Sequence, residues 1–294
     1  MAADIAITPR GPFSWELATD MLGTFPPTAH HGAGPVVRIA FPLDGGFQPV
    51  AAKLWWEDGT LYGQVAGTSH VEQVQDQVTR IFSLDVDGTG YPAVGERDPF
   101  IGRLMELRPG QRPVLFTSPY ECAAWAVISQ RINRLQAARI KDRLIDERGE
   151  RIEVGGGTAR CFPPPDRLLD LEEVPGLAAA KVARLRGVAS AALGGMLDAD
   201  RLKEMGEAAA VKYLRLVPGI GEFWAQGVYS RACSAPDAFP GEPATLAALA
   251  AARGEPEPPS GQELEEITDR WRPYRMWVSV LLRLAAGRGL LETR

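Results

Sequence analysis

One short segment of this chain has the residue types and spacing of an anion-binding turn. In Pro218-Gly219-Ile220-Gly221, two glycines flank one apolar residue, directly after Leu216 and Val217. Glycine permits left-handed backbone angles and leaves no side chain over the amides, which would lie at the N-terminus of the next helix. Such amides bind phosphate without net positive charge on the protein. The segment therefore predicts a helix-hairpin-helix turn that binds DNA phosphate; the alternative is an ordinary tight turn between two helices.

The net charge constrains how such a chain would contact DNA. The formal charge is −5, which argues against a protein that coats nucleic acid without selectivity. Basic residues cluster locally between Arg131 and Arg143 and between Lys181 and Arg186. Each cluster is either a DNA-facing surface or a solvated helix face. We therefore expect any DNA contact to be local and to include the hairpin.

Cysteine and histidine offer no metal or redox site. The three cysteines are far apart and form no Cys-x-x-Cys spacing, which argues against a zinc ribbon or an iron–sulfur cluster. His30 and His31 are adjacent, but a metal site needs further ligands, so we expect both to be surface residues. No metal or other cofactor is predicted. The odd cysteine count, with no signal-peptide pattern and no long apolar run, favours a cytoplasmic protein, and the predicted DNA binding makes us expect it to be nucleoid-associated.

The elements that would position this chemistry differ between the two halves of the chain. Residues 1–35 are rich in Pro and Gly and are predicted to be irregular. Strands are expected over 36–41, 48–56 and 60–65, with glycine-containing turns between them. A helix is expected over 71–82. Hydrophobic residues make up 45% of the chain, enough to bury a core.

From Ser118 the pattern becomes helical. Ser118-Pro119-Tyr120-Glu121 is a capping box with Pro at the first helical position. Helical spacing then continues to about residue 231, and two more helices are expected over 262–271 and 274–286. The fold class is predicted to be α+β, in three parts. These parts are an N-terminal α+β domain over 1–117, a helical domain with the hairpin over 118–235, and a C-terminal helical subdomain over 236–294.

Further strings around the hairpin resemble the helix-hairpin-helix DNA glycosylases, in particular the bacterial 3-methyladenine DNA glycosylase II group. The matching strings are Gly11-Pro12-Phe13-Ser14-Trp15, Arg80-Ile81-Phe82-Ser83-Leu84-Asp85, Asp98-Pro99-Phe100 through Pro109-Gly110, Ala126-Val127-Ile128-Ser129-Gln130-Arg131-Ile132, Cys161-Phe162-Pro163-Pro164-Pro165 and Arg270-Trp271-Arg272-Pro273-Tyr274-Arg275. The resemblance covers most of the chain. It implies an antiparallel N-terminal sheet like the TATA-binding-protein repeat, and helical subdomains whose cleft receives a nucleotide rotated out of the DNA stack.

The resemblance also implies a catalytic carboxylate soon after the hairpin. In the family, an Asp there stabilises the positive charge that develops on the sugar as the glycosidic bond breaks. Counted from Asp237, Pro243 occupies that position in this chain. Proline has no carboxylate, so Glu242, one residue earlier, is the candidate catalytic residue. Asp237 itself matches a different family Asp, for which a structural role is implied.

Aromatic residues are implied to line the base pocket. Phe223 stands where relatives with lyase activity have the Lys that forms a Schiff base, so a monofunctional enzyme is implied. Phe223, Trp224 and Tyr274 are expected to contact the extruded base, and stacking on a cationic methylated base is the family's mode. Ordinary core packing is the alternative for each. Gly227 stands where relatives often have a second aromatic residue.

Other positions concern the DNA rather than the base. Gln130 and Arg131 are expected to contact DNA, with Arg131 filling the space that the extruded base leaves. Phe25 stands where an Arg is expected. These replacements and Pro243 leave the catalytic competence of the chain open.

The resemblance implies two main functions. The first is a monomeric, monofunctional DNA N-glycosylase of base excision repair that removes alkylated purines from damaged or distorted double-stranded DNA, with Glu242 in place of the usual Asp. The second is a catalytically impaired protein of the same fold that recognises damaged DNA without cutting the glycosidic bond. A purely structural or protein-interaction role is a third, which the intact hairpin disfavours.

Overall fold

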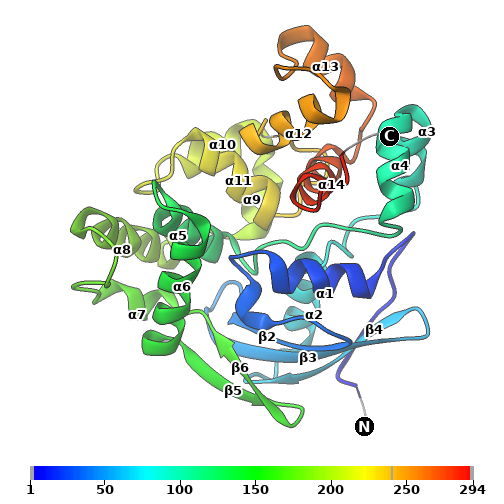
Figure 1. The fold of residues 1–294 in the computed structure, drawn as a ribbon. Helices are drawn as coiled ribbons and strands as arrows, with labels where there is room; N and C mark the ends of the chain where they lie inside the picture. The colour runs from blue at the N-terminus through cyan, green and yellow to red at the C-terminus, as the bar shows by residue number, and fades with distance from the viewer. Residues whose placement is uncertain (1–2, 240, 292–294) are drawn as a thin grey trace.

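An antiparallel sheet and the helices that surround it form the body of the computed structural model, which describes residues 3–239 and 241–291 (Figure 1). The sheet has four strands in the order β1-β4-β3-β2. The strands are β1 (Ile5–Ile7), β2 (Val36–Pro42), β3 (Pro49–Glu57) and β4 (Thr60–Ala66). The predicted strands are thus confirmed, and β1 is an addition. The turn between β3 and β4 consists of Asp58 and Gly59 with φ of 47° and 78°, which matches the right-handed twist of a hairpin.

The predicted α+β class is confirmed, since the remaining elements are mostly helices. The N-terminal half contains α1 (Trp15–Thr24), α2 (Val71–Ile81), α3 (Pro92–Arg97), α4 (Pro99–Leu107), α5 (Pro119–Ser129) and α6 (Arg134–Arg148). The C-terminal half contains α7 (Pro165–Leu169), α8 (Ala179–Leu193), α9 (Ala199–Met205), α10 (Glu207–Leu214), α11 (Glu222–Ala232), α12 (Pro243–Arg253), α13 (Gly261–Asp269) and α14 (Arg275–Gly287). Similarity of the sheet to the TATA-binding-protein repeat stays a prediction.

The prediction that residues 1–35 are irregular is wrong, because α1 lies within them. Ser14 caps α1: its side-chain oxygen accepts a hydrogen bond from the Leu17 amide, which satisfies one of the free N–H groups at the helix start. The helix buries Trp15, Met21 and Leu22 in the core. It also brings the segment that follows it to the cavity described below.

A second hairpin, β5 (Glu150–Val154) with β6 (Gly157–Cys161), was not expected from the sequence. Gly155 and Gly156 have positive φ and form its turn. Arg38 of β2 donates hydrogen bonds to the carbonyls of Val154 and Gly155, with lengths of 3.1 and 2.9 Å. The hairpin is therefore fixed against the sheet.

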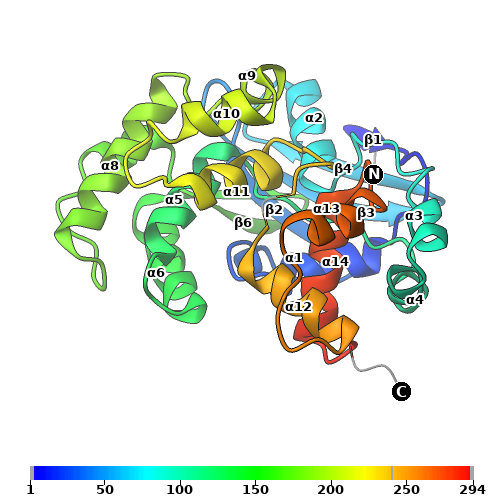
Figure 2. The same cartoon turned by 90° about the horizontal axis from the view of Figure 1, so that it is seen from above.

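Two hydrophobic cores hold the helices in two groups. One core joins the sheet, α1, α2 and α4 to α12, α13 and α14, with Trp271 and Trp277 fully buried in it. The other joins the helices from α5 to α11. In Figure 2, α5, α6 and α8 lie on one side and α12 to α14 on the other. The three-part division made from the sequence stays a prediction, but the C-terminal helices share their core with the N-terminal region.

Candidate functional site

The hairpin between α10 and α11 has the backbone that its sequence predicts. Gly219 has a φ of +86°, and a Cβ added to it would lie 2.9 Å from Cδ of Arg184, so only glycine fits without strain. Ile220 is 5% exposed and fills the space between the two helices. Gly221 is the N-cap of α11. Within the described ranges, the amides of Gly219 and Gly221 have no hydrogen-bond acceptor, so they are available to an anion.

Side chains from α8 and from the end of α5 hold the hairpin in place. The side-chain amide nitrogen of Gln130 donates a hydrogen bond to the carbonyl of Gly219 at 2.7 Å, and its side-chain oxygen accepts one from Arg184 at 3.1 Å. Lys181 donates to the carbonyls of Ile128 and Gln130, at 2.8 and 2.5 Å. Partial burial, together with Arg184, lowers the pKa of Lys181. Gln130 thus positions the hairpin.

Arg131 follows Gln130 directly and is exposed, with a φ of +56°. A positive φ is uncommon for a residue other than glycine, and it marks a tight turn at the end of α5. Its neighbour Gln130 is bonded to the carbonyl of Gly219, so the backbone of Arg131 lies close to the hairpin. Its use as a DNA contact stays a prediction.

A cavity of about 370 Å³ lies beside α11, the helix that follows the hairpin. Segments from α1 to α14 line it: Met21, Thr24, Phe25, Pro26, Pro27, Phe116, Trp125, Ser129, Ile132, Arg134, Phe223, Trp224, Gly227, Arg231, Glu242, Val280, Arg283 and Leu284. Phe223 and Trp224 come from the first turn of α11, so the hairpin also fixes one wall of the cavity. Phe223 is 45% exposed, whereas ordinary core packing would bury it.

Glu242 is the single carboxylate among these lining residues. It is the N-cap residue of α12, and Pro243 is the first residue of that helix, where proline's fixed φ and missing N–H are tolerated. Pro243 therefore has a structural reason to follow Glu242. The Glu242 carboxylate forms an ion pair with Arg283 of α14, and the two side chains are 14% and 20% exposed.

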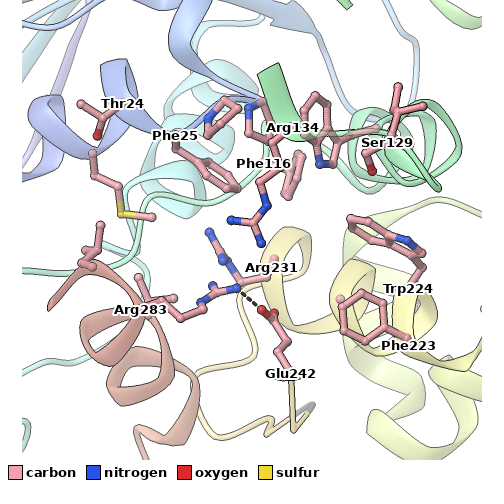
Figure 3. Close-up of a pocket in the computed structure, with 18 residues that line it drawn as sticks. Thr24, Phe25, Phe116, Ser129, Arg134, Phe223, Trp224, Arg231, Glu242 and Arg283 are labelled. Atoms are coloured by element: carbon pink, nitrogen blue, oxygen red, sulfur yellow. Dashed lines mark hydrogen bonds and ion pairs between the residues drawn. The ribbon is translucent and has the colours of Figure 1, made fainter. Parts of the chain in front are cut away.

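Three arginines share the cavity with that carboxylate. In Figure 3 the side chains of Arg134, Arg231 and Arg283 converge on one region of it. Burial lowers the pKa of Arg231 to about 10. Burial also lowers the pKa of Arg283, and the neighbouring charges of Arg231 and Arg134 lower it further.

Most of the residues expected at the base pocket are found together, and one is not. Phe223, Trp224 and Glu242 line the cavity, as do Phe25 and Gly227, the two positions that depart from the family pattern. Tyr274, expected in the pocket, instead lies in the core. Its hydroxyl donates to the carbonyl of Asp87 at 2.6 Å, and its ring packs on Tyr91 and Trp277.

Asp237 lies in a network of its own. Its carboxylate accepts from Arg275 at 3.1 Å and forms an ion pair with Arg272. These bonds join the segment after α11 to the start of α14 and the loop before it. The structural role implied for Asp237 agrees with this placement.

Sequence reasoning missed the three arginines. Arg231 lies far along α11, Arg283 lies in α14, and Arg134 was grouped with a basic cluster. The prediction that His30 and His31 are surface residues is wrong for His31, which is buried, whereas His30 is half-buried. Their rings pack together with centroids 3.8 Å apart, and His31 is 8% exposed. In the part of the chain described by the structure, no group of three or more His, Cys, Asp or Glu residues is placed to hold a metal ion.

Solved structures similar to this one share its fold over most of the chain. The 3-methyladenine DNA glycosylase from Archaeoglobus fulgidus matches with a TM-score of 0.79 and 23% identity, over 96% of this chain and 97% of that one. An 8-oxoguanine glycosylase/lyase from Clostridium acetobutylicum, in complex with double-stranded DNA, matches with a TM-score of 0.61 and 16% identity, over 83% and 87%. The Schizosaccharomyces pombe 3-methyladenine DNA glycosylase, in complex with abasic DNA, matches with a TM-score of 0.51 and 19% identity, over 65% and 93%.

The curated relatives are much longer than this chain, and the match spans less than half of their length. The probable bifunctional transcriptional activator/DNA repair enzyme AlkA of Mycobacterium tuberculosis is 27% identical over 204 residues, which is 68% of this chain and 40% of that protein. No family model matches the chain. None of the helices within residues 3–239 and 241–291 has the length and hydropathy to cross a bilayer. The resemblance predicted from the sequence is confirmed by these likenesses.

Proposed function

We propose that this chain, which has the fold of the helix-hairpin-helix DNA glycosylases, binds double-stranded DNA and receives an extruded, damaged nucleotide in the cavity around Glu242. The observation that carries the proposal is the continuity of the two sites. Gly221 caps α11, and Phe223 and Trp224, two and three residues later, line the cavity. A phosphate bound at the hairpin would therefore hold the duplex beside the opening of the cavity.

DNA binding rests on the hairpin and the residues that hold it. The free amides of Gly219 and Gly221 would bind one backbone phosphate at the start of α11. Pro218 packs against Gly187, where an added Cβ would lie 2.7 Å from the proline ring, so the turn is held firmly against α8. Arg131 would add a charged contact close to the hairpin. In this role the protein acts as a monomer on nucleoid DNA in the cytoplasm.

The cavity has the groups that hydrolysis of a glycosidic bond requires. Extrusion brings the bond out of the stack, where a protein can reach it. As the bond breaks, positive charge develops on the sugar, and the Glu242 carboxylate would stabilise it and orient a water molecule toward C1′. No lysine is among the residues that line the described cavity, so the reaction would be hydrolysis without a Schiff base.

Recognition without cleavage is the second candidate function. The ion pair with Arg283 directs the Glu242 carboxylate toward another protein group and offsets its negative charge. Both effects weaken the stabilisation that an oxocarbenium-like sugar would receive. This ion pair is the observation that supports the second candidate, a protein that binds damaged DNA without cleaving the glycosidic bond.

The names of the relatives add a role and a substrate class to the proposal. They describe DNA repair enzymes and glycosylases for 3-methyladenine. On that basis we assign the chain to base excision repair and take alkylated purines as the first substrates to test.

A base-release assay distinguishes the two candidate functions. Wild-type protein is incubated with duplexes that each carry one damaged base, and the abasic product is cleaved and counted. We expect release by the wild type and a loss of about 100-fold in rate for Glu242→Gln, since general acid–base and electrostatic groups contribute on that scale. Glu257→Gln, in an exposed loop, is the matched control.

Each outcome of that assay has one meaning. Release that depends on Glu242 supports hydrolysis. Binding of the damaged duplex without release by the wild type supports recognition alone. Release at the wild-type rate by Glu242→Gln would contradict the role of this carboxylate, and the absence of any duplex binding would contradict the proposed function as a whole.

A further inference from the structure

We propose that the cavity around Glu242 selects an uncharged or anionic base that carries carbonyl oxygens, and that it disfavours the cationic methylated purines. The inference rests on the proposed function, because it assumes that a base enters this cavity. Three observations support it: the charges of the residues that line the cavity, the arginine N–H donors that lack an acceptor, and the change in charge of a base as its glycosidic bond breaks.

The charges that line the cavity do not balance. Arg134, Arg231 and Arg283 contribute three positive charges and Glu242 contributes one negative charge. Glu242 is paired with Arg283, so Arg134 and Arg231 have no carboxylate partner in the cavity. The three guanidinium groups are close enough that Arg231 and Arg134 both lower the pKa of Arg283. A base with a positive charge would enter a region that is already positive, whereas a base with electron-rich oxygens would not be repelled.

Two of these arginines also carry unused hydrogen-bond donors. Within the described ranges, the buried Nε–H groups of Arg231 and Arg283 have no acceptor. Arg231 is 4% exposed, and one of its Nη atoms is already used, because it donates to the carbonyl of Val114 at 3.2 Å. A buried donor without an acceptor is costly. A ligand that brings carbonyl oxygens into the cavity would supply acceptors, which a positively charged ring supplies less well.

The aromatic residues of the cavity are arranged consistently with this selection. The guanidinium carbon of Arg231 lies 5.1 Å from the ring centroid of Phe25, so one face of that ring is already used by a cation. Phe223 and Trp224 contact each other edge to face with centroids 5.4 Å apart. Their faces could stack on a flat base and would attract a cationic one by about 0.5–1 kcal/mol, so these two rings do not exclude cationic bases. Charge selection therefore falls to the arginines.

The bond-breaking step gives the arginines a further effect. When the C1′–N bond breaks, its electron pair goes to the base, a water oxygen bonds to C1′, and a proton from that water passes to Glu242. An uncharged base leaves as an anion and then takes up a proton, whereas a cationic base leaves uncharged. Arginines beside the leaving base stabilise the anion and give no such help to the uncharged product. The cavity should therefore stabilise the transition state for release of an uncharged base more than that for release of a cationic base.

A pair of isosteric bases tests the charge selection. Duplexes carry either 7-methylguanine, which is cationic, or 7-methyl-7-deazaguanine, which has the same shape and carbonyl but no charge. Affinities are measured by fluorescence anisotropy at one salt concentration. We expect the uncharged base to bind about fivefold more tightly, and xanthine to bind about fivefold more tightly than hypoxanthine, which has one carbonyl fewer.

Variants of α6 connect the preference to the cavity. Arg134→Gln removes one lining charge and should at least halve the preference for the uncharged base, whereas Arg139→Gln, an exposed residue of the same helix outside the cavity, should leave it unchanged. Equal or tighter binding of 7-methylguanine, with binding that still depends on Gly221, would overturn this inference alone. If no duplex is bound, or if Gly221→Asp leaves binding unchanged, the proposed function fails instead.

Discussion

The carboxylate of Glu242 accepts a hydrogen bond from the guanidinium of Arg283, across 41 residues of chain. Glu242 is the N-cap of α12, and Arg283 lies in α14. The position of the candidate catalytic carboxylate is therefore set by the packing of two C-terminal helices. The cation that neutralises this carboxylate also lines the cavity. A change in the ion pair should therefore affect the stability of the protein, the charge of the base that it binds and the activity of Glu242.

We predict that Arg283→Met lowers the free energy of unfolding by about 2 kcal/mol. The substitution leaves the largely buried Glu242 carboxylate without its charged donor, and hydrogen bonds to charged groups are worth this much. Urea unfolding followed by circular dichroism measures the change. The control is Arg215→Met, whose partner Glu222 is well exposed, and which should cost less than about 1 kcal/mol. Equal losses of unfolding free energy in the two variants would show that the Glu242–Arg283 pair stabilises the fold no more than an exposed ion pair does.

We predict that Gly221→Asp weakens binding to every duplex by roughly tenfold or more, irrespective of sequence. Gly221 has an ordinary φ of −84°, and an added Cβ meets no atom within 4 Å, so the backbone tolerates the change. The new carboxylate would lie beside the free amides and repel the phosphate, and loss of one charged hydrogen bond accounts for the magnitude. Fluorescence anisotropy with several unrelated duplexes measures it.

The matched control for this experiment is Gly46→Asp. Gly46 lies in the turn between β2 and β3, is exposed, has no positive φ, and an added Cβ there meets no atom within 4 Å, so this variant adds the same charge without strain. Its affinity should equal that of the wild type. If Gly221→Asp also binds like the wild type, the hairpin does not hold the phosphate.

We predict that His31 makes the protein less stable in acid. Burial, together with the nearby Lys141 and Arg160, lowers the pKa of His31 from its ordinary value of 6.5 to about 3. Between these pH values the unfolded chain binds one more proton than the folded chain, so the free energy of unfolding falls as the pH is lowered from 6.5 toward 3. The slope from this residue is at most about 1.4 kcal/mol per pH unit.

Substitution separates this effect from general acid denaturation. His31→Leu should flatten the fall in unfolding free energy between pH 6.5 and 4, as measured by urea titrations at several pH values. His30 contacts His31 and also has a lowered pKa, owing to burial and then His31, so part of the slope remains. His70→Leu, at an exposed site, should leave the slope intact. The same slope in His31→Leu and the wild type would refute the prediction.

We predict that Phe223→Ala reduces the preference for damaged over undamaged duplexes with little effect on stability. The ring is 45% exposed, so its loss should change the unfolding free energy by less than about 1 kcal/mol. Stacking of one base on an aromatic ring is worth about 1–3 kcal/mol, so the preference should fall by roughly fivefold or more. Leu135→Ala, 70% exposed and outside the cavity, is the control. An unchanged preference would place the base elsewhere.

Local patterns predicted the parts of the site that depend on adjacent residues. The hairpin was evident from its spaced glycines, and Phe223 and Trp224 follow it directly, so their wall of the cavity could be placed as well. Glu242 was found because it neighbours the position that the family pattern marks. The turn at Asp58 and Gly59 was likewise evident.

The rest of the site depends on contacts between segments far apart in the chain. Nothing near Arg283 shows that α14 turns it toward Glu242, and nothing near Phe25 shows that α1 leads it into the cavity. Tyr274 was misplaced for the same reason, since a string that matches a family does not say which side of a helix faces the pocket. The missed β5–β6 hairpin had a local signal in Gly155 and Gly156, which form its turn.

The central claim, that bound DNA delivers a nucleotide into the cavity around Glu242, is tested most directly by the fluorescence of 2-aminopurine placed next to the target, which rises when the target base leaves the stack beside it. One duplex with xanthine at the target position and 2-aminopurine as its neighbour is titrated with protein, and anisotropy on the same sample reports binding. The account predicts that fluorescence rises in step with binding for the wild type and for Glu242→Gln, whereas Gly221→Asp needs at least about tenfold more protein. Saturated binding with unchanged fluorescence would contradict it.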